Sequence, residues 1–298
     1  MGRIWIGLVL IAAITSMPEM ATGVSSVAFV GSPDLALGTL LGSCCFNLAI
    51  LAVLDVLNAR APVLSEASPR HIAAAGYGIL LIAVVAGGIL LGRGGAVVSF
   101  GWVGIGSVAV FVLYMVGMRR MFSIARRQQR PSVEVSSPHY AEIPRRRVYV
   151  KFSASAAAVI CAGVWLAFIG DDIGEATGWN ASFVGSLFLA ITTSAPELVV
   201  TIAALRLGAI DLAVADVLGA NLLDVAIIAP VDLCYREGLV LSSVSSSHLM
   251  TAAAAAGMYL LVVAGLKSPG RRRAFGIVSW YALPLVGLYI LAAYASFT

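Results

Sequence analysis

The sequence is short of charge. Only 11% of its 298 residues are Asp, Glu, Lys or Arg, whereas 60% are hydrophobic, and the mean hydropathy is +0.97. A soluble domain carries about a quarter charged residues, so the composition excludes a soluble globular protein. It indicates an all-α integral membrane protein with several spans. The net charge of +4 comes from arginines beside apolar runs, which argues against a nucleic-acid-binding surface.

Thiol and imidazole groups are scarce as well. The four cysteines lack the paired spacing of a zinc or redox site, and the three histidines lie in predicted loops or at the ends of predicted spans. An intramembrane enzyme would need a nucleophile–base pair or paired metal-binding histidines inside the spans. The sequence therefore predicts no catalytic residue, no bound cofactor and no thiolate–imidazole metal centre.

Nine apolar segments are long enough to cross a bilayer, which takes about 20 helical residues. They cover residues 4–30, 34–57, 70–91, 97–118, 151–170, 179–205, 210–234, 246–266 and 273–296. Residues 119–149 are instead rich in arginine, and residues 171–175 form a predicted acidic loop. We expect two halves, residues 1–118 and 150–298, joined by a basic linker over residues 119–149.

The distribution of positive charge predicts the orientation. Lys and Arg gather in the cytoplasmic segments of membrane proteins. If the 119–149 linker is cytoplasmic, nine alternating spans place 17 of the 19 Lys and Arg residues on that side. The sequence therefore predicts a multi-pass protein of the cell (inner) membrane with its C-terminus outside.

A short string occurs once in each half. Thr15–Glu19 reads TSMPE and Thr193–Glu197 reads TSAPE, and each lies within an apolar segment. A carboxylate in a membrane span is costly and indicates a functional site. The proline before it lacks the N–H that would pair with the carbonyl four residues earlier, so it breaks the helix and frees that oxygen. Each string therefore predicts part of a cation site.

A second pair of strings follows the first. Asp34–Asn47 aligns with Asp211–Asp224 without a gap, and the charge argument makes the two copies enter the membrane from opposite sides. The halves therefore form an inverted repeat, as in many secondary transporters. A span, residues 151–170, precedes the motif of the second half, but none precedes that of the first. We expect a five-plus-five arrangement whose first helix is missing, either because it is absent or because the start codon is wrongly assigned.

The oxygen-bearing side chains of these strings form the candidate site. Hard oxygen ligands suit Ca²⁺ and Na⁺ rather than Zn²⁺ or Cu⁺. A single motif would equally suit a polar helix contact at a kink, but two inverted copies favour cation transport. The candidate metal-binding residues are Glu19, Asn47, Glu197 and Asp224, with Thr15, Ser16, Ser43, Thr193 and Ser194.

Other acids in the spans receive different interpretations. Asp34 and Asp211 begin helices, where a negative charge is favourable, so we expect them to act as caps. Asp55 and Asp232 lie near span ends, within expected reach of water. Asp216 lies about a turn and a half inside its span. Its role stays open between a proton or cation relay and a polar contact.

At the paired strings the sequence resembles the membrane region of the sodium/calcium exchangers, in the cation/Ca²⁺ antiporter superfamily. In that family the Pro-Glu string is followed, once per half, by a Gly-Ser-Asn-x-x-Asn or -Asp helix. Gly42–Asn47 and Gly219–Asp224 match it, except that Cys44 replaces the usual Asn and Ala220 the usual Ser.

The resemblance implies roles for the site residues. Glu19 and Glu197 would be central carboxylates that Ca²⁺ and Na⁺ share in turn, and Asn47 and Asp224 would complete the ring. The Ser and Thr residues named above would line flanking Na⁺ positions. The implied function is Ca²⁺/Na⁺ antiport by alternating access, and the alternative is a Ca²⁺ or other cation/H⁺ antiporter of the same fold. The partners would be these ions and the lipid bilayer; a monomer would suffice, although the sequence does not fix the oligomeric state.

Overall fold

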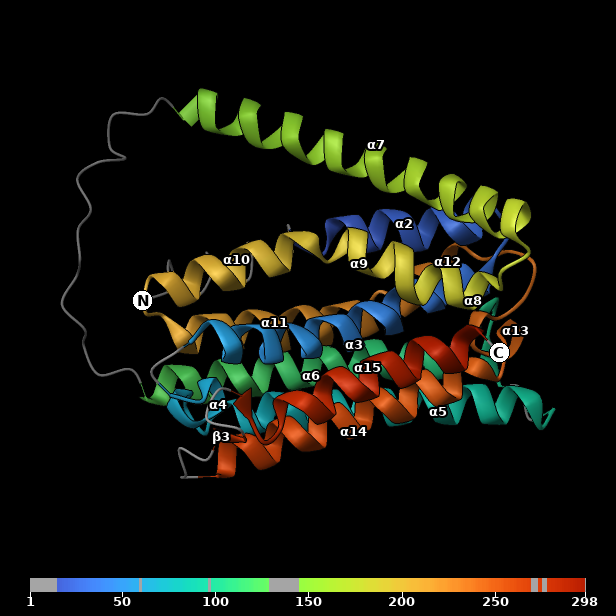
Figure 1. Ribbon diagram of the computed structural model, residues 1–298. Coiled ribbons are helices and arrows are strands. Elements are labelled where there is room, and N and C mark those ends of the chain that lie inside the picture. The colour runs from blue at the N-terminus through green and yellow to red at the C-terminus, as the bar shows by residue number, and fades with distance from the viewer. Residues whose placement is uncertain are drawn as a thin grey trace.

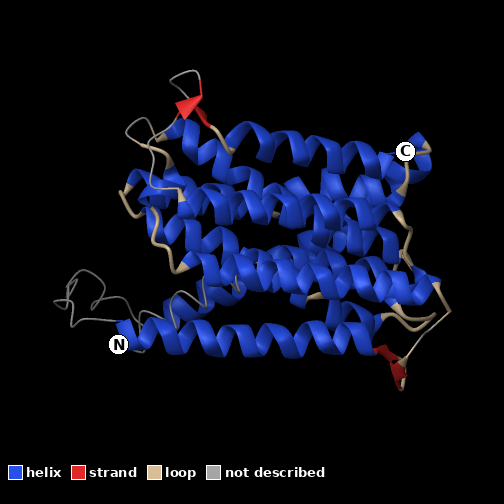
Figure 2. Ribbon diagram, turned by 90° about the horizontal axis from the view of Figure 1, so that it is seen from below, coloured by secondary structure: helices blue, strands red, loops and turns tan. Residues whose placement is uncertain are grey.

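A computed structural model describes residues 15–58, 61–95, 98–128, 145–268, 273–274 and 278–297. Most of the described residues form helices that run roughly along one axis and pack into a bundle (Figures 1 and 2). Two short antiparallel hairpins lie at opposite ends of the bundle (Figure 2). They are β1 with β2, Ser99–Phe100 and Val103–Gly104, and β3 with β4, Arg273–Ala274 and Val278–Ser279.

The helices follow the order of the predicted spans. In the first half they are α2 (Met17–Ala28), α3 (Pro33–Leu57), α4 (Val63–Glu66), α5 (His71–Arg93) and α6 (Ile105–Gln128). In the second half they are α7 (Arg145–Thr177), α8 (Ala181–Val184), the π-helix η2 (Gly185–Leu189), α9 (Ala190–Thr193), α10 (Ala195–Arg206), α11 (Ile210–Ala226), α12 (Ile228–Cys234), α13 (Val240–Ser243), α14 (Ser247–Lys267) and α15 (Ala282–Phe297).

The count of membrane spans is lower than nine when it rests on length and apolar composition. Among the described residues, six helices meet both criteria, or seven if the bent segment from Ala181 to Arg206 is one span. Helix α15 is shorter, and residues 4–14 of the first predicted span lie outside the described residues. The nine-span count and the missing first helix therefore remain predictions.

Several boundaries differ from those predicted. Residues 171–175, predicted as an acidic loop, lie in the last turns of α7. Acidic residues are compatible with a helix, so an acidic segment does not by itself predict a loop. Helices α6 and α7 extend into both ends of the predicted linker, and residues 129–144 lie outside the described part. Helix α15 starts later than predicted because its expected first turns form the β3–β4 hairpin.

The centre of the bundle is built on α3 and α11. In the most apolar window of α3 78% of residues are buried, and in that of Ile210–Cys234, which joins α11 and α12, 72% are buried. The value is 11% in α7, which lies along the outside (Figure 1). Glycines bring the broken helix of the second half onto α3. A Cβ on Gly38 would lie 2.8 Å from the Ser182 carbonyl oxygen, and one on Gly42 would overlap the backbone of Ser186. Only glycine permits this close approach.

Asp34 and Asp211 bond to other elements rather than capping their own helices, which corrects the prediction. Asp34 Oδ1 accepts the Ser245 N–H at 2.7 Å and lies 2.9 Å from His248 Nε2, just before and within the first turn of α14. Asp211 Oδ1 accepts the Ser68 N–H at 2.7 Å and lies 2.9 Å from His71 Nε2, at the start of α5. The inverted repeat thus places the same Asp–Ser–His arrangement at both ends of the bundle.

Asp55 and Asp232 were predicted to reach water, and this is wrong. Both are fully buried. Asp55 accepts hydrogen bonds from the N–H groups of Val63 and Ser279 and from the Tyr281 hydroxyl. Asp232 accepts the N–H groups of Val240 and Gly104. These carboxylates satisfy backbone donors where the chain turns at the span ends, so they hold loops and not ions.

Candidate functional site

The two Thr-Ser-x-Pro-Glu strings break their helices in the same way. Ser16 precedes α2 with φ −85° and ψ 8°, and Ser194 precedes α10 with φ −88° and ψ 9°, each with a proline in the first turn that follows. In the second half the axis bends by 43° between α9 and α10. Helices α2, α9 and α10 meet midway along the bundle (Figure 1). The breaks therefore lie at the depth expected for a mid-membrane site.

Each of the two glutamates lies against hydroxyls of the opposite repeat. Glu19 and Glu197 are fully buried in the first turns of α2 and α10. The Ser194 hydroxyl donates to Glu19 Oε1 at 3.1 Å, and Thr193 also lies beside Glu19. Thr15 lies beside Glu197. These contacts between the two Thr-Ser-x-Pro-Glu segments bring both copies of the motif into one cluster.

The partner helices α3 and α11 complete this cluster. Asn47 Nδ2 donates to Asp224 Oδ2 at 3.3 Å, and the Ser43 and Thr193 hydroxyl oxygens are 3.4 Å apart. Ser16 lies beside Asp224. All nine predicted site residues are buried, and the structure brings them together at the contact between the two repeats.

Several buried oxygens in this cluster lack a hydrogen bond of good geometry. Within the described residues, no well-formed hydrogen bond reaches Glu19 Oε2, either Glu197 carboxylate oxygen, Asp224 Oδ1, Asn47 Oδ1 or Ser16 Oγ. Asp224 is also close enough to both glutamates for their charges to repel. Burying unpaired oxygens and like charges is costly unless a cation compensates them.

The geometry limits how a cation would be held. Among the residues that the structure describes, no three Asp, Glu, His or Cys side chains gather closely enough to hold a metal ion by themselves. A cation at the cluster would therefore need the neutral oxygens of Asn47, Ser and Thr as well. Ca²⁺ takes six to eight oxygens and accepts carbonyl, amide and carboxylate ligands together.

Sequence reasoning missed one pair beside the cluster. Asn221 Nδ2 donates to the Cys44 carbonyl oxygen at 3.0 Å, and the Cys44 thiol lies 3.7 Å from the Asn221 carbonyl oxygen. The two residues occupy the same position in the two repeats. That equivalence was the available signal, because equivalent positions on two helices that cross at a two-fold axis lie opposite each other. The pair ties α3 to α11.

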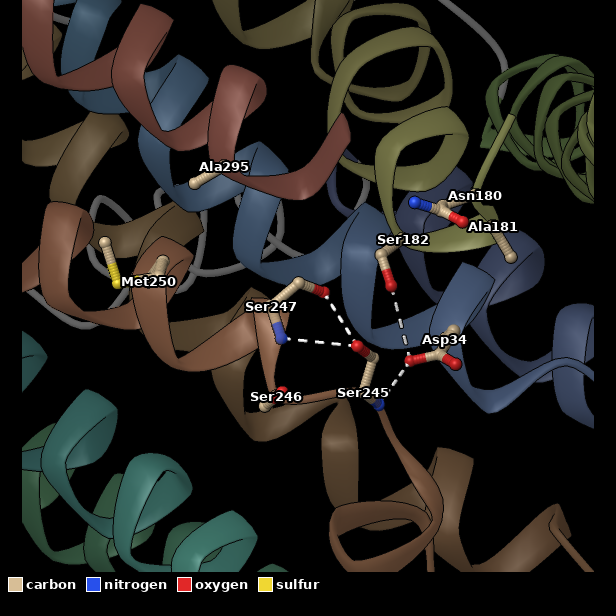
Figure 3. A pocket seen from close by; sticks show the side chains of 9 residues that line it. All are labelled: Asp34, Asn180, Ala181, Ser182, Ser245, Ser246, Ser247, Met250 and Ala295. Carbon is tan, nitrogen blue, oxygen red and sulfur yellow. Dashed lines mark hydrogen bonds between the residues drawn. The ribbon is translucent and has the colours of Figure 1, made fainter. Parts of the chain in front are cut away.

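A separate cavity of about 480 Å³ lies away from the cluster, where α3, α8 and α14 begin (Figure 3). Figure 3 shows the Asp34 carboxylate between Ser182 and Ser245, which donate to its Oδ1 at 3.3 and 2.7 Å. His248, which is fully buried, contacts both Asp34 and Ser182. Asp34 Oδ1 thus already has three partners. The cavity is a polar opening at one end of the bundle and, among the described residues, does not contain a second group of carboxylates.

Comparison with known proteins gives a family match over most of the chain. A model of the family described as sodium/calcium exchanger protein matches residues 1–119 and 148–298. Inner membrane protein YrbG of Escherichia coli (strain K12) is 29% identical over 234 residues, which cover 75% of this chain and 66% of that protein. The chain thus spans slightly less than two thirds of that relative.

Solved structures share the fold. Native YfkE has a TM-score of 0.62 and 17% identity, covering 97% of this chain and 89% of that one. The H⁺/Ca²⁺ exchanger CAX has a TM-score of 0.60 and 15% identity, covering 97% and 82%. The sodium-calcium exchanger NCX_Mj in 2.5 mM Na⁺ and 1 mM Sr²⁺ has a TM-score of 0.58 and 21% identity, covering 96% and 85%.

Proposed function

Because the chain belongs to the sodium/calcium exchanger protein family, we propose that it exchanges Ca²⁺ for Na⁺ across the inner membrane. The family consists of membrane cation/Ca²⁺ antiporters and not of enzymes, and the apolar helices and the inner-membrane relative agree with a multi-pass protein. The proposal rests mainly on one observation: three buried carboxylates at the contact of the two repeats have oxygens without a well-formed hydrogen bond within the described residues. Such a cluster is stable only with a cation bound or a proton taken up.

The proposed binding site uses residues from both repeats. Glu19, Glu197 and Asp224 would supply the negative charge for Ca²⁺, and Asn47 would add its amide oxygen. The hydroxyls of Thr15, Ser16, Ser43, Thr193 and Ser194 would line flanking Na⁺ positions. All of these residues come from one chain, so a monomer would suffice, and the transported ions are the substrates, so no cofactor is needed.

Exchange follows from the cost of the empty site. Ca²⁺ and Na⁺ would occupy overlapping oxygens and therefore not bind together. Without a cation, the buried carboxylates repel one another in a medium of low dielectric constant, which opposes reorientation of the site. Helix α7 is the proposed moving element. It packs along α2 on the outside of the bundle, where the Thr22 hydroxyl bonds the Gly163 carbonyl at 3.1 Å.

Proton coupling is the second candidate, and two residues favour it. Ala220 stands where the first repeat has Ser43, so one flanking hydroxyl is absent from the second repeat. Asp224 stands where the first repeat has Asn47, so the ring gains a carboxylate that can take a proton. A Ca²⁺/H⁺ antiporter of the same fold would use the same ring with fewer Na⁺ ligands.

The test is uptake of radioactive Ca²⁺ into proteoliposomes loaded with Na⁺, with K⁺-loaded vesicles as the control and a separate arm with only a pH gradient. Uptake that depends on internal Na⁺ would support Na⁺ coupling. Uptake with the pH gradient alone would support the proton-coupled form. Absence of uptake in both arms, with a monodisperse protein, would overturn the proposal that this protein moves Ca²⁺.

A further inference from the structure

We propose that Asp216 is a transient cation-binding residue on the path between the central ring and the end of the bundle where α11 begins. This inference rests on the proposed function and adds a step to it. The ring residues lie on the contact between the repeats, whereas Asp216 lies towards the start of α11. Asp216 belongs neither to the ring nor to the acids that bind loop backbone, Asp55 and Asp232.

The position of Asp216 points to the path. It precedes Asp224 by two helical turns, about 12 Å along the axis, and Ala220 lies one turn from each. It is close enough to Glu197 on α10 for their charges to interact. Helix α10 ends and α11 begins at the same end of the bundle (Figure 1), the end that the charge pattern predicts to be cytoplasmic.

The environment of Asp216 points to a ligand. The residue is 8% exposed, whereas Glu197 and Asp224 are fully buried. Its Oδ2 atom is buried without a hydrogen-bond partner among the described residues. A structural carboxylate in this chain looks different: the oxygens of Asp55 accept backbone and hydroxyl donors. The unpartnered oxygen of Asp216 is therefore available to a passing cation.

The repeat supplies the comparison. The equivalent position in the first half is Thr39, which is fully buried and donates its hydroxyl to the Leu35 carbonyl oxygen at 2.8 Å. The fold thus accepts a threonine at this position, because its hydroxyl forms a hydrogen bond within its own helix. A carboxylate at one of the two positions makes the two approaches to the ring chemically unequal. A fixed negative charge beside a narrow low-dielectric path raises the local concentration of cations.

The experiment compares the two faces of the membrane. Asp216→Thr copies the residue of the first repeat, Asp216→Glu keeps the charge, and Thr39→Val is the matched control. Transport of Ca²⁺ is measured in right-side-out and inside-out membrane vesicles, and the half-saturating Ca²⁺ concentration is determined at each face. For Asp216→Thr we expect that value to rise about tenfold at the face where α11 begins and to stay within about twofold at the other face. Asp216→Glu should restore it, and Thr39→Val should leave both faces unchanged.

Two outcomes would overturn the inference: unchanged half-saturation at both faces in Asp216→Thr, or an equal loss at both faces that Asp216→Glu does not restore. The second outcome would make Asp216 a polar packing contact. If the wild-type protein moves no Ca²⁺ under any gradient, the proposed function fails and this inference fails with it. A transporting wild type with unaltered Asp216 variants refutes the inference alone.

Discussion

Neutralising Glu197 should weaken Ca²⁺ binding and at the same time stabilise the protein without Ca²⁺. Both carboxylate oxygens of Glu197 are buried without a well-formed hydrogen bond within the described residues. In Glu197→Gln the shape is kept and the charge is lost. The cation loses one of its charged ligands, while the empty site no longer holds this repulsive charge.

The magnitude follows from the burial. Removing one partner of a buried charge pair costs about 3–5 kcal/mol, which is roughly two to three and a half orders of magnitude in affinity. An unpaired buried ion destabilises the fold by several kcal/mol unless it takes up a proton. Above the pH at which the empty wild-type site loses its protons, the variant without Ca²⁺ should therefore unfold at a higher temperature than the wild type. Glu19→Gln should gain less stability, because the Ser194 hydroxyl already donates to Glu19 at 3.1 Å and offsets part of that penalty.

The assay is thermal unfolding of detergent-purified protein with and without Ca²⁺, together with Ca²⁺ uptake in proteoliposomes. The wild type should be stabilised by Ca²⁺, and Glu197→Gln should lose both that increment and the uptake. Near-normal uptake by Glu197→Gln, or a Ca²⁺-free unfolding temperature below that of the wild type, would refute the reasoning from unpartnered burial.

Other substitutions test the packing around the site. Gly42→Leu should abolish transport and give an aggregated species in size-exclusion chromatography, because its Cβ would overlap the Ser186 backbone. Gly219→Ala should instead behave as the wild type, since its Cβ would meet no described atom within 4 Å; equal behaviour of the two variants would contradict this. Asp55→Ala should lower stability by about 3 kcal/mol or more in thermal unfolding, because it leaves buried donors of Val63, Ser279 and Tyr281 unpaired. Unchanged unfolding would show that these donors find other acceptors.

The clustering of the candidate site residues was predictable because these residues repeat. Glu19 and Glu197 stand in apolar segments, where a charge is rare, and each follows a proline within the same short string. Two copies in opposite orientation imply a two-fold relation, and a two-fold relation brings equivalent elements to one place. The short motifs and their symmetry were therefore enough to predict that these residues lie together, even though the two copies are far apart along the chain.

The acids at the span ends were not predictable in the same way. Asp34 was expected to cap its own helix, but it accepts from Ser245 and contacts His248. Asp55 was expected to reach water, but it is fully buried. A carboxylate near a helix end has favourable partners both in its own first turn and in a loop of a neighbouring element. Only the packing of the neighbour decides between them.

The sequence by itself determined the membrane class, the broken helices and the oxygen-rich character of the site, because these follow from composition, proline chemistry and helical spacing. The tertiary structure decided which hydroxyls face which carboxylate: Ser194 donates to Glu19 across the repeats, and Asn47 to Asp224. It also decided which oxygens stay unpartnered, including that of Asp216. Spacing along one helix fixes a face, but the partner of that face depends on how helices distant in sequence pack together.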